Sequence, residues 1–186
     1  GDHRDLHLSI RRQRQMCIRD RTFRELRGPI TDKKVTFVGD GYNMCHSYIN
    51  ASRRWDFNLT VCCPTGFEPN NDILEGGTKP RLERIPEKAV SGADLVVTDV
   101  WSSMGHEGYE MERKKTFKPY QITESLLDLA AENTLFMHCL PAHRGEEVNE
   151  TILDDERSVV WREAGNRLHS QKALVEFMLG ATIADP

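Results

Sequence analysis

Apolar and polar positions along the chain follow two alternating periods, and this alternation predicts an α/β fold. Short apolar runs rich in β-branched residues recur between longer segments whose apolar residues have helical spacing. The runs predict strands over residues 35–38, 58–62, 82–85, 94–99, 134–138 and 158–161. Because helical segments separate them, the strands should be joined by right-handed crossovers into a doubly wound, mainly parallel sheet with helices on both faces.

Helices are expected between the strands, over residues 43–54, 86–91, 123–131 and 167–179. Thr123 should cap the third helix, because its hydroxyl can accept a hydrogen bond from a backbone N–H of the first turn. The apolar residues of the last helix fall mostly on one face: Leu168, Ala173, Leu174, Phe177 and Met178. The polar segments 67–79 and 106–118 predict no clear element.

The composition is that of one globular domain with a sizeable core. The chain has 186 residues, of which 38% are hydrophobic, and a domain of about 150 residues buries roughly two thirds of its chain surface on folding. Acidic and basic residues are mixed and the net charge is −4, which argues against nucleic acid as the main partner. No apolar run approaches the roughly 20 residues of a membrane span, and no segment resembles a signal peptide.

The cysteines indicate a reducing environment. There are five, at positions 17, 45, 62, 63 and 139, and no two have the C-x-x-C spacing. An odd number without paired spacing is a poor disulfide framework, so we expect a cytoplasmic protein with free thiols.

The first 21 residues differ from the rest of the chain. They contain six arginines, few candidate core residues and no helical or strand period. One interpretation is a basic arm that binds nucleic acid. We favour another, because residues 11–21 are similar to translated sequencing-adapter read-through at the end of an assembled fragment. We therefore predict that residues 1–21 are a non-native segment and that residues 22–186 form the domain.

Reactive side chains follow two of the predicted strands. The strand at 134–138 ends in His138 and Cys139, and Pro141 prevents its continuation. The strand at 94–99 ends at Asp99 and is followed by Ser103. Since the carboxyl ends of parallel strands meet at the edge where open α/β sheets bind ligands, these side chains should converge on one site.

Each of these residues also has a structural interpretation. Asp99 could cap the next segment, although a buried carboxylate needs a cation or several donors. A free cysteine such as Cys139 is most often a small core residue, and His138 is more often a hydrogen-bonded core histidine than a catalyst. The Gly39–Gly41 turn lacks the third glycine of a dinucleotide-binding fingerprint, which favours a tight strand-to-helix turn. Asn43, just inside the following helix, could be a cap or a ligand donor.

Three motifs taken together are more specific than any one of them. Residues 39–47 read Gly-Asp-Gly-Tyr-Asn-Met-Cys-His-Ser, residues 98–105 read Thr-Asp-Val-Trp-Ser-Ser-Met-Gly, and residues 138–141 read His-Cys-Leu-Pro. In this order they closely resemble the C-terminal, ornithine-binding domain of the ornithine carbamoyltransferases, as does the stretch from 163 to 169. The resemblance covers about residues 22–180. Aspartate carbamoyltransferases differ at His-Cys-Leu-Pro, and putrescine carbamoyltransferases differ at Ser-Met-Gly.

The resemblance implies roles for four residues in binding ornithine. Asn43 and the main chain of Met104 would bind the α-carboxylate of the substrate. Asp99 and Ser103 would bind its α-ammonium group, and Asp99 would also belong to the catalytic residues.

The resemblance also implies how the reacting groups are held. Cys139, as a catalytic residue, and the carbonyl of Leu140 would lie beside the reacting δ-nitrogen and the carbamoyl group, and Arg167 would reach the oxygens of carbamoyl phosphate. Fixed donors of this kind stabilise a developing oxyanion and a leaving phosphate. No metal or organic cofactor is expected. Gly165 departs from the family, which usually has Glu there, and this puts the positioning of Arg167 in question.

The complete enzyme implied by this resemblance converts carbamoyl phosphate and L-ornithine to L-citrulline and phosphate, as a homotrimer in arginine metabolism. The Ser-Thr-Arg-Thr loop and His-Pro-x-Gln segment of its N-terminal, carbamoyl phosphate-binding domain do not occur in these 186 residues. The chain is therefore expected to be the second half of the enzyme and inactive alone. Two alternatives are a nucleotide-binding dehydrogenase domain, which the incomplete glycine motif disfavours, and a non-catalytic module that binds an amino acid or a partner enzyme.

Overall fold

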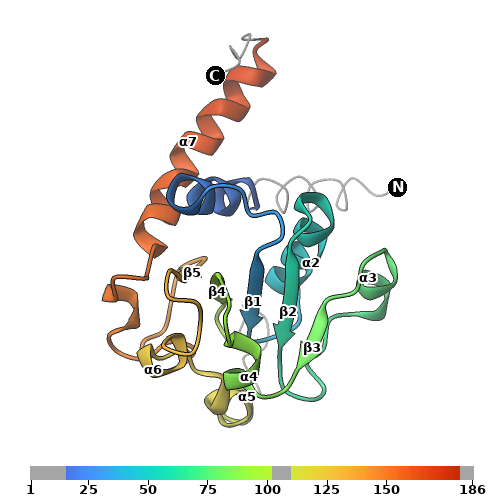
Figure 1. Cartoon of the computed structure of the whole chain (residues 1–186), viewed down its shortest axis with the longest axis vertical. Helices are drawn as coiled ribbons and strands as arrows, with labels where there is room; N and C mark the ends of the chain where they lie inside the picture. The colour runs from blue at the N-terminus through green and yellow to red at the C-terminus, as the bar shows by residue number, and fades with distance from the viewer. Residues whose placement is uncertain (1–15, 102–109, 181–186) are drawn as a thin grey trace.

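The chain folds around a five-stranded, fully parallel sheet (Figure 1). The computed structural model describes residues 16–101 and 110–180. The strands are β1 (Lys34–Val38), β2 (Asn58–Cys62), β3 (Arg81–Glu83), β4 (Leu95–Thr98) and β5 (Leu135–His138), in the order β3-β2-β1-β4-β5. The chain moves outward from β1 to β3, returns, and moves outward again from β4 to β5. This order confirms the predicted doubly wound fold.

Helices connect the strands and cover both faces of the sheet. They are α2 (Asn43–Trp55), α3 (Asn71–Glu75), α4 (Pro86–Val90), α5 (Glu110–Phe117), α6 (Glu124–Leu127) and α7 (Val160–Met178), with single 3₁₀ turns at Lys118–Tyr120 and Ile152–Asp154. Residues 16–27 form a further helix before β1. None of the helices in the described residues is long and apolar enough to cross a membrane.

Side chains of alternate strand residues enter two separate cores. On β1, Val35 and Phe37 pack with α2 in one core, whereas Val38 packs with α4 in the other. Successive strand side chains point to opposite faces, so an apolar run can serve both cores at once. This is why the central strands read as nearly continuous apolar runs in the sequence.

Several sequence predictions differ from the structure at the ends of elements. The strand expected over 158–161 is wrong: Ser158 makes only an isolated bridge to Phe136, and α7 begins at Val160. The helix expected over 123–131 ends at Leu127, although its cap is confirmed, because the Thr123 hydroxyl accepts a hydrogen bond from the Leu126 N–H at 3.2 Å. A short apolar run alone does not distinguish a strand from the entry into a helix.

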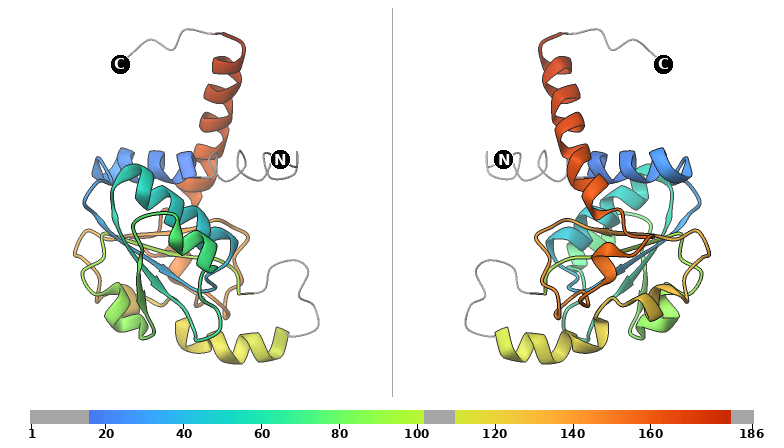
Figure 2. Two further views of the ribbon diagram at one scale, coloured as in Figure 1. Left: turned by 90° about the vertical axis from the view of Figure 1, so that its right-hand side faces the viewer. Right: turned by 90° about the vertical axis from the view of Figure 1, so that its left-hand side faces the viewer.

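The final helix is longer than predicted, and its outer half is bare. In Figures 1 and 2, α7 extends away from the sheet, and no described element lies beside its outer turns. Its predicted apolar face is largely exposed: Leu168 by 70%, Phe177 by 68% and Met178 by 75%. The helix therefore carries an apolar surface that the described part of this chain does not cover.

The helix at residues 16–27 lies against both α2 and α7. Met16 and Phe23 belong to the core that α2 shares with the sheet, and the Thr22 hydroxyl accepts a hydrogen bond from Asn166 of α7 at 2.9 Å. We expected no element from residues 1–21, because they lack a period. The helix is nevertheless held by a few buried apolar side chains, among them Met16 and Phe23, and by this hydrogen bond. The non-native origin of the segment remains a prediction.

Candidate functional site

A cavity of about 640 Å³ opens where β4 and β5 end. The register aligns Val38 of β1 with Thr98 of β4, and Thr98 with His138 of β5, so the residues that follow these strands meet at one edge. The cavity is lined by Ile18, Arg19, Asn43, Met44, Asp99, His138, Cys139, Leu140, Pro141, Glu163, Ala164 and Arg167. Five predicted site residues are thus together: Asn43, Asp99, Cys139, Leu140 and Arg167. Two others, Ser103 and Met104, lie outside the described residues.

Cys139 and Asp99 form a hydrogen-bonded pair in this cavity. The Cys139 thiol donates to Oδ1 of Asp99 at 2.9 Å, and the same oxygen accepts the backbone N–H of Val100 at 2.8 Å. Burial, followed by the charge of Asp99, raises the pKa of the Cys139 thiol well above its ordinary value. The thiol is therefore protonated at neutral pH, which makes it a hydrogen-bonding group and a weak nucleophile. Asp99 thus accepts the N–H of the adjacent residue and orients the thiol. Most of the segment that it could cap lies outside the described residues.

A buried histidine shapes the turn that carries Cys139. The backbone N–H of Leu140 donates to Nδ1 of His138 at 3.0 Å, so the neutral ring carries its proton on Nε2. Nε2 lies 3.3 Å from Oε1 of Glu147, and both side chains are fully buried. Leu140 itself has a φ of 49°, a conformation that few residues with a side chain adopt. His138 is thus a core histidine that holds the backbone of the site.

Asn43 and Arg167 reach the cavity from two helices. Asn43 is the first residue of α2, and the cap position before it belongs to Tyr42, which makes no side-chain cap bond. The Asn43 amide forms no hydrogen bond with any described residue, so of its two interpretations the cap does not hold and its side chain is available to a ligand. Arg167 of α7 is exposed and has no ion-pair partner within the described ranges.

The glycine turn after β1 is structural. A Cβ on Gly41 would lie 2.5 Å from the Phe67 carbonyl oxygen, and Gly39 has a φ of 138°. Both positions therefore require glycine. Asp40 between them pairs with Arg113 of α5, whose guanidinium also donates to the Trp101 carbonyl. The turn is a tight connection, as the sequence favoured.

Sequence reasoning missed one buried ion pair in this cavity. Nε of Arg19 lies 3.1 Å from Oε1 of Glu163, and both side chains are about 5% exposed. Burial raises the pKa of the Glu163 carboxyl, and the charge of Arg19 opposes this shift. No pattern pointed to the pair, because Arg19 lies in the segment predicted to be non-native and Glu163 drew attention only as part of the family-like stretch 163–169.

Only one group of described side chains has the spacing of metal ligands. It consists of His143, Glu146 and Glu147. Lys114 already pairs with Glu146 at 2.8 Å, and Glu147 faces His138 and accepts the His143 backbone N–H at 2.6 Å. The carboxylates therefore have protein partners, and this geometry favours a structural role.

Comparison with known proteins identifies relatives of this chain. Residues 31–178 match the family model described as aspartate/ornithine carbamoyltransferase, Asp/Orn binding domain. The chain is 57% identical to the ornithine carbamoyltransferase of Chromohalobacter salexigens and 54% identical to the anabolic enzyme of Pseudomonas aeruginosa, each over 159 residues. Each alignment covers 85% of this chain and 52% of the relative. The chain thus spans about half the length of the curated relatives that it matches.

Solved structures give the same result. The ornithine carbamoyltransferase of Burkholderia thailandensis superposes with a TM-score of 0.81 at 40% identity, over 91% of this chain and 55% of that one. The enzyme of Pyrococcus furiosus superposes with a TM-score of 0.80 at 42% identity, over 88% and 55%. The resemblance seen in the three sequence motifs is confirmed.

Proposed function

Because the chain belongs to the aspartate/ornithine carbamoyltransferase family and spans its Asp/Orn-binding domain, we propose that the whole protein is an ornithine carbamoyltransferase. It transfers the carbamoyl group of carbamoyl phosphate to the δ-amine of L-ornithine, giving L-citrulline and phosphate. The observation that carries this proposal is the cavity at the carboxyl edge of the sheet, where Asn43, Asp99, Cys139, Leu140 and Arg167 lie together.

Asn43 and Asp99 bind opposite charges of the ornithine backbone in this proposal. The Asn43 amide has no other partner in the described chain and can donate to the α-carboxylate, as can the main chain of Met104. The Asp99 carboxylate, with Ser103, accepts from the α-ammonium group. A charge-assisted hydrogen bond of this kind contributes roughly 1.5–3 kcal/mol. Ornithine is thereby fixed at one end, with its δ-amine directed along the cavity.

Cys139 and the Leu140 carbonyl hold the reacting end. The neutral δ-amine attacks the carbonyl carbon of carbamoyl phosphate, the bond from that carbon to the phosphate oxygen breaks, and the nitrogen loses a proton. The raised pKa of Cys139 keeps its thiol protonated, which favours direct attack by the amine over a covalent thiol intermediate. Cys139 and Leu140 therefore orient the amine, and positioning of two substrates is itself a large part of catalysis.

Arg167 is proposed to contact the oxygens of carbamoyl phosphate. Gly165 stands two residues before it, and a Cβ built there would meet nothing within 4 Å. The larger residue usual in this family would fit, so Gly165 leaves open space and creates no clash. We expect Gly165→Glu to stabilise α7 by about 0.5–1 kcal/mol, because glycine weakens a helix interior.

The exposed apolar face on the outer half of α7 supports the proposal that another domain packs there. Leu174, Phe177 and Met178 are 38%, 68% and 75% exposed, and an apolar surface of this kind marks a contact with other protein. The alignment with the relative from Chromohalobacter salexigens covers only 52% of that relative. We propose that the N-terminal, carbamoyl phosphate-binding domain covers this face.

The remaining features concern the whole enzyme. We propose a cytoplasmic homotrimer that serves arginine metabolism, in which a neighbouring subunit completes each carbamoyl phosphate site. The free cysteines fit a reducing compartment. Light scattering on the full-length protein tests the trimer, and a monomer that is fully active would contradict it.

A further proposal concerns residues 1–21 and the native gene. We propose that the native gene continues upstream of Thr22 into the carbamoyl phosphate domain in place of this segment. Amplifying and sequencing the genomic locus tests this. Recovery of the same 21 residues from the intact locus would end the idea.

A citrulline assay on the purified chain tests the half-enzyme proposal. The chain holds the ornithine residues and lacks the phosphate loop, so we expect no turnover, because catalysis needs both substrates in one cleft. Adding the separately expressed N-terminal domain should restore turnover. Turnover by the chain alone would refute the proposal. A reassembled pair that binds ornithine but carbamoylates a different amine would refute the assigned substrate.

A further inference from the structure

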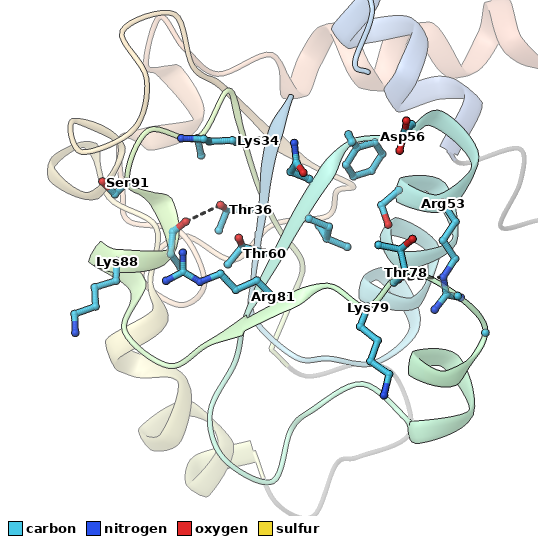
Figure 3. A pocket seen from close by; sticks show the side chains of 18 residues that line it. Lys34, Thr36, Arg53, Asp56, Thr60, Thr78, Lys79, Arg81, Lys88 and Ser91 are labelled. Atoms are coloured by element: carbon cyan, nitrogen blue, oxygen red, sulfur yellow. Dashed lines mark hydrogen bonds between the residues drawn. The ribbon is translucent and has the colours of Figure 1, made fainter. Parts of the chain in front are cut away.

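A second cavity, of about 620 Å³, lies at the amino ends of β1, β2 and β3 (Figure 3). Its walls come from these strand ends, from the end of α2, from the loop at residues 76–79 and from α4. None of the residues that line this amino-end cavity lines the candidate functional site. It is a separate feature of the fold, and the proposed function leaves it unexplained.

The sheet is polar where it lines this cavity. Lys34 pairs in register with Asn58, Thr36 pairs with Thr60, and Thr60 pairs with Arg81. Since strand side chains alternate, these five share one face of the sheet. Farther along the same face, Val38 and Cys62 are buried in the core beneath α4. Parallel strands are normally apolar on both faces, so this polar start is unusual. Thr36 is buried and donates to the Ala89 carbonyl of the five-residue α4, whereas Lys34 and Arg81 are exposed.

The charged side chains that line the cavity are mostly positive. Its lining holds five cations and a single carboxylate, Asp56; the cations are Lys34, Arg53, Lys79, Arg81 and Lys88. Of these five cations, only Arg81 forms an ion pair with a described carboxylate, that of Glu83 at 3.1 Å. The chain as a whole has a net charge of −4, so this local excess does not reflect general basicity.

One of these cations is fixed in place by the loop beside it. The Arg53 guanidinium donates to the carbonyl of Ile73 at 2.6 Å and to that of Thr78 at 3.4 Å. A Cβ on Gly76 would lie 3.0 Å from Nη1 of Arg53, and Gly77 has a φ of 141°. The loop therefore packs closely against the guanidinium, and two loop carbonyls hold Arg53 at the edge of the cavity.

The remaining cations come from β1, from β3 and the loop before it, and from α4. Figure 3 shows Arg81 reaching across the sheet face toward Thr36 and Thr60, while Lys79 and Lys88 project from the rim. The Thr60 hydroxyl is partly buried and makes no hydrogen bond with any described residue, so it can donate to a ligand. Cations from several elements around one space favour an anion with more than one oxygen, because such an anion can contact more than one of them.

We propose that the amino-end cavity binds a compact multivalent anion of the phosphate class, such as the diphosphate group of a small organic phosphate. The volume lies in the range of small-molecule sites, roughly 300–1,000 Å³. Phe57, the one aromatic side chain in the lining, is 6% exposed. The cavity thus has no stacking platform of the kind with which proteins bind single-stranded nucleic acid. This proposal does not depend on the carbamoyltransferase activity.

Calorimetric titration of the purified chain with inorganic pyrophosphate tests the site. We compare wild type with Lys34→Ala/Arg81→Ala, and with Lys115→Ala/Lys118→Ala as a control that removes the same charge outside the cavity. The cavity variant should bind at least about tenfold more weakly, because two charge-assisted bonds are lost. The control should stay within about twofold of wild type, because distant exposed charges are screened by salt.

Three results would overturn the proposal. These are no binding by wild type at millimolar pyrophosphate, equal weakening in both double variants, and tighter binding of a single-stranded RNA oligonucleotide through the same residues. Circular dichroism establishes that each variant is folded. If the double variant is unfolded, Lys88→Ala replaces it, since that side chain is exposed, and an unchanged affinity in Lys88→Ala would count against the site.

Discussion

The two ends of the parallel sheet differ in how far their polar side chains are buried and paired. At the carboxyl end, polar groups are buried or partly buried and lie against one another: Cys139 donates a hydrogen bond to Asp99, and His138 and Arg19 lie 3.3 Å and 3.1 Å from the carboxylates of Glu147 and Glu163. At the amino end, Lys34, Arg81 and Lys88 are exposed, and only Arg81 has a carboxylate partner among the described residues. A buried polar group without a partner costs about 1–3 kcal/mol, whereas water solvates an exposed charge. The carboxyl end is therefore preorganised, and the amino end is open to a ligand.

The largest effect should come from the carboxylate at the carboxyl end of β4. Asp99→Asn in the full-length enzyme removes a charge-assisted bond worth roughly 1.5–3 kcal/mol, so kcat/KM for ornithine should fall at least about tenfold. Thermal stability should change little, because the Asn oxygen can still accept from Val100 and Cys139. Asp94→Asn, just before the amino end of the same strand, is the matched control and should leave the kinetics unchanged. Unchanged kinetics in Asp99→Asn would show that Asp99 is only a cap.

A smaller effect, on folding, is expected at Glu147. Replacing it by Ala leaves the backbone N–H of His143 without an acceptor and removes the carboxylate that faces His138, so it should cost about 1–3 kcal/mol in the free energy of unfolding. Asp56→Asn removes an exposed charge at the amino end, keeps a residue type that tolerates the φ of 54° at this position, and should cost less than about 0.5 kcal/mol. Urea denaturation measures both. Equal effects would mean that burial does not distinguish the two ends.

Alkaline pH should weaken the carboxyl end in particular. Burial raises the pKa of Cys62 to about 12 and that of Cys63 to about 11, from an ordinary value of 9.0. Because folding raises these pKa values, the unfolded chain loses the protons first. Stability is complete below about pH 9 and falls as the pH rises toward 11–12, by up to about 1.4 kcal/mol per pH unit for each thiol. Cys62→Ala should make this decline shallower in denaturation curves collected from pH 8 to 11, and an identical slope would contradict the assignment.

The smallest effect is expected from the cations at the amino end. Lys34→Gln should change the free energy of unfolding by less than about 0.5 kcal/mol, toward stabilisation, because the side chain is exposed and lies among like charges. Adding salt should remove the difference between variant and wild type. A loss of more than about 1 kcal/mol would show that Lys34 has a structural role that its exposure does not reveal.

Most strands of the sheet could be predicted from the sequence, and the errors of that prediction have a common cause. The runs at 35–38, 58–62, 94–99 and 134–138 are strands within one residue at each end, because a strand buried on both faces needs an apolar run. The run at 158–161 is also short and apolar, but it leads into α7. A short apolar run alone therefore did not distinguish a strand from the start of a helix. The apolar face of α7 was predicted correctly as a pattern, but a pattern does not say what covers it.

The sequence predicted residues of the candidate site but not the contacts between them. Asp99 and Cys139 were recognisable because reactive residues follow apolar runs, and the motifs around them brought Asn43, Leu140 and Arg167 with them. The hydrogen bond from Cys139 to Asp99 and the burial of His138 against Glu147 had no signal in the sequence. These contacts join residues that lie nine to forty positions apart.

The sequence by itself determined the strand–helix order, the parallel sheet and the family, because these follow from local periodicity and from motifs of a few adjacent residues. Only the tertiary structure decided which polar groups are bound to one another and which are free. The in-register pairing of three strands gathers Lys34, Thr60 and Arg81 on one open face, and the packing of α7 encloses Glu163. Burial determines the cost of an unpaired charge, and burial depends on elements that are distant in the chain.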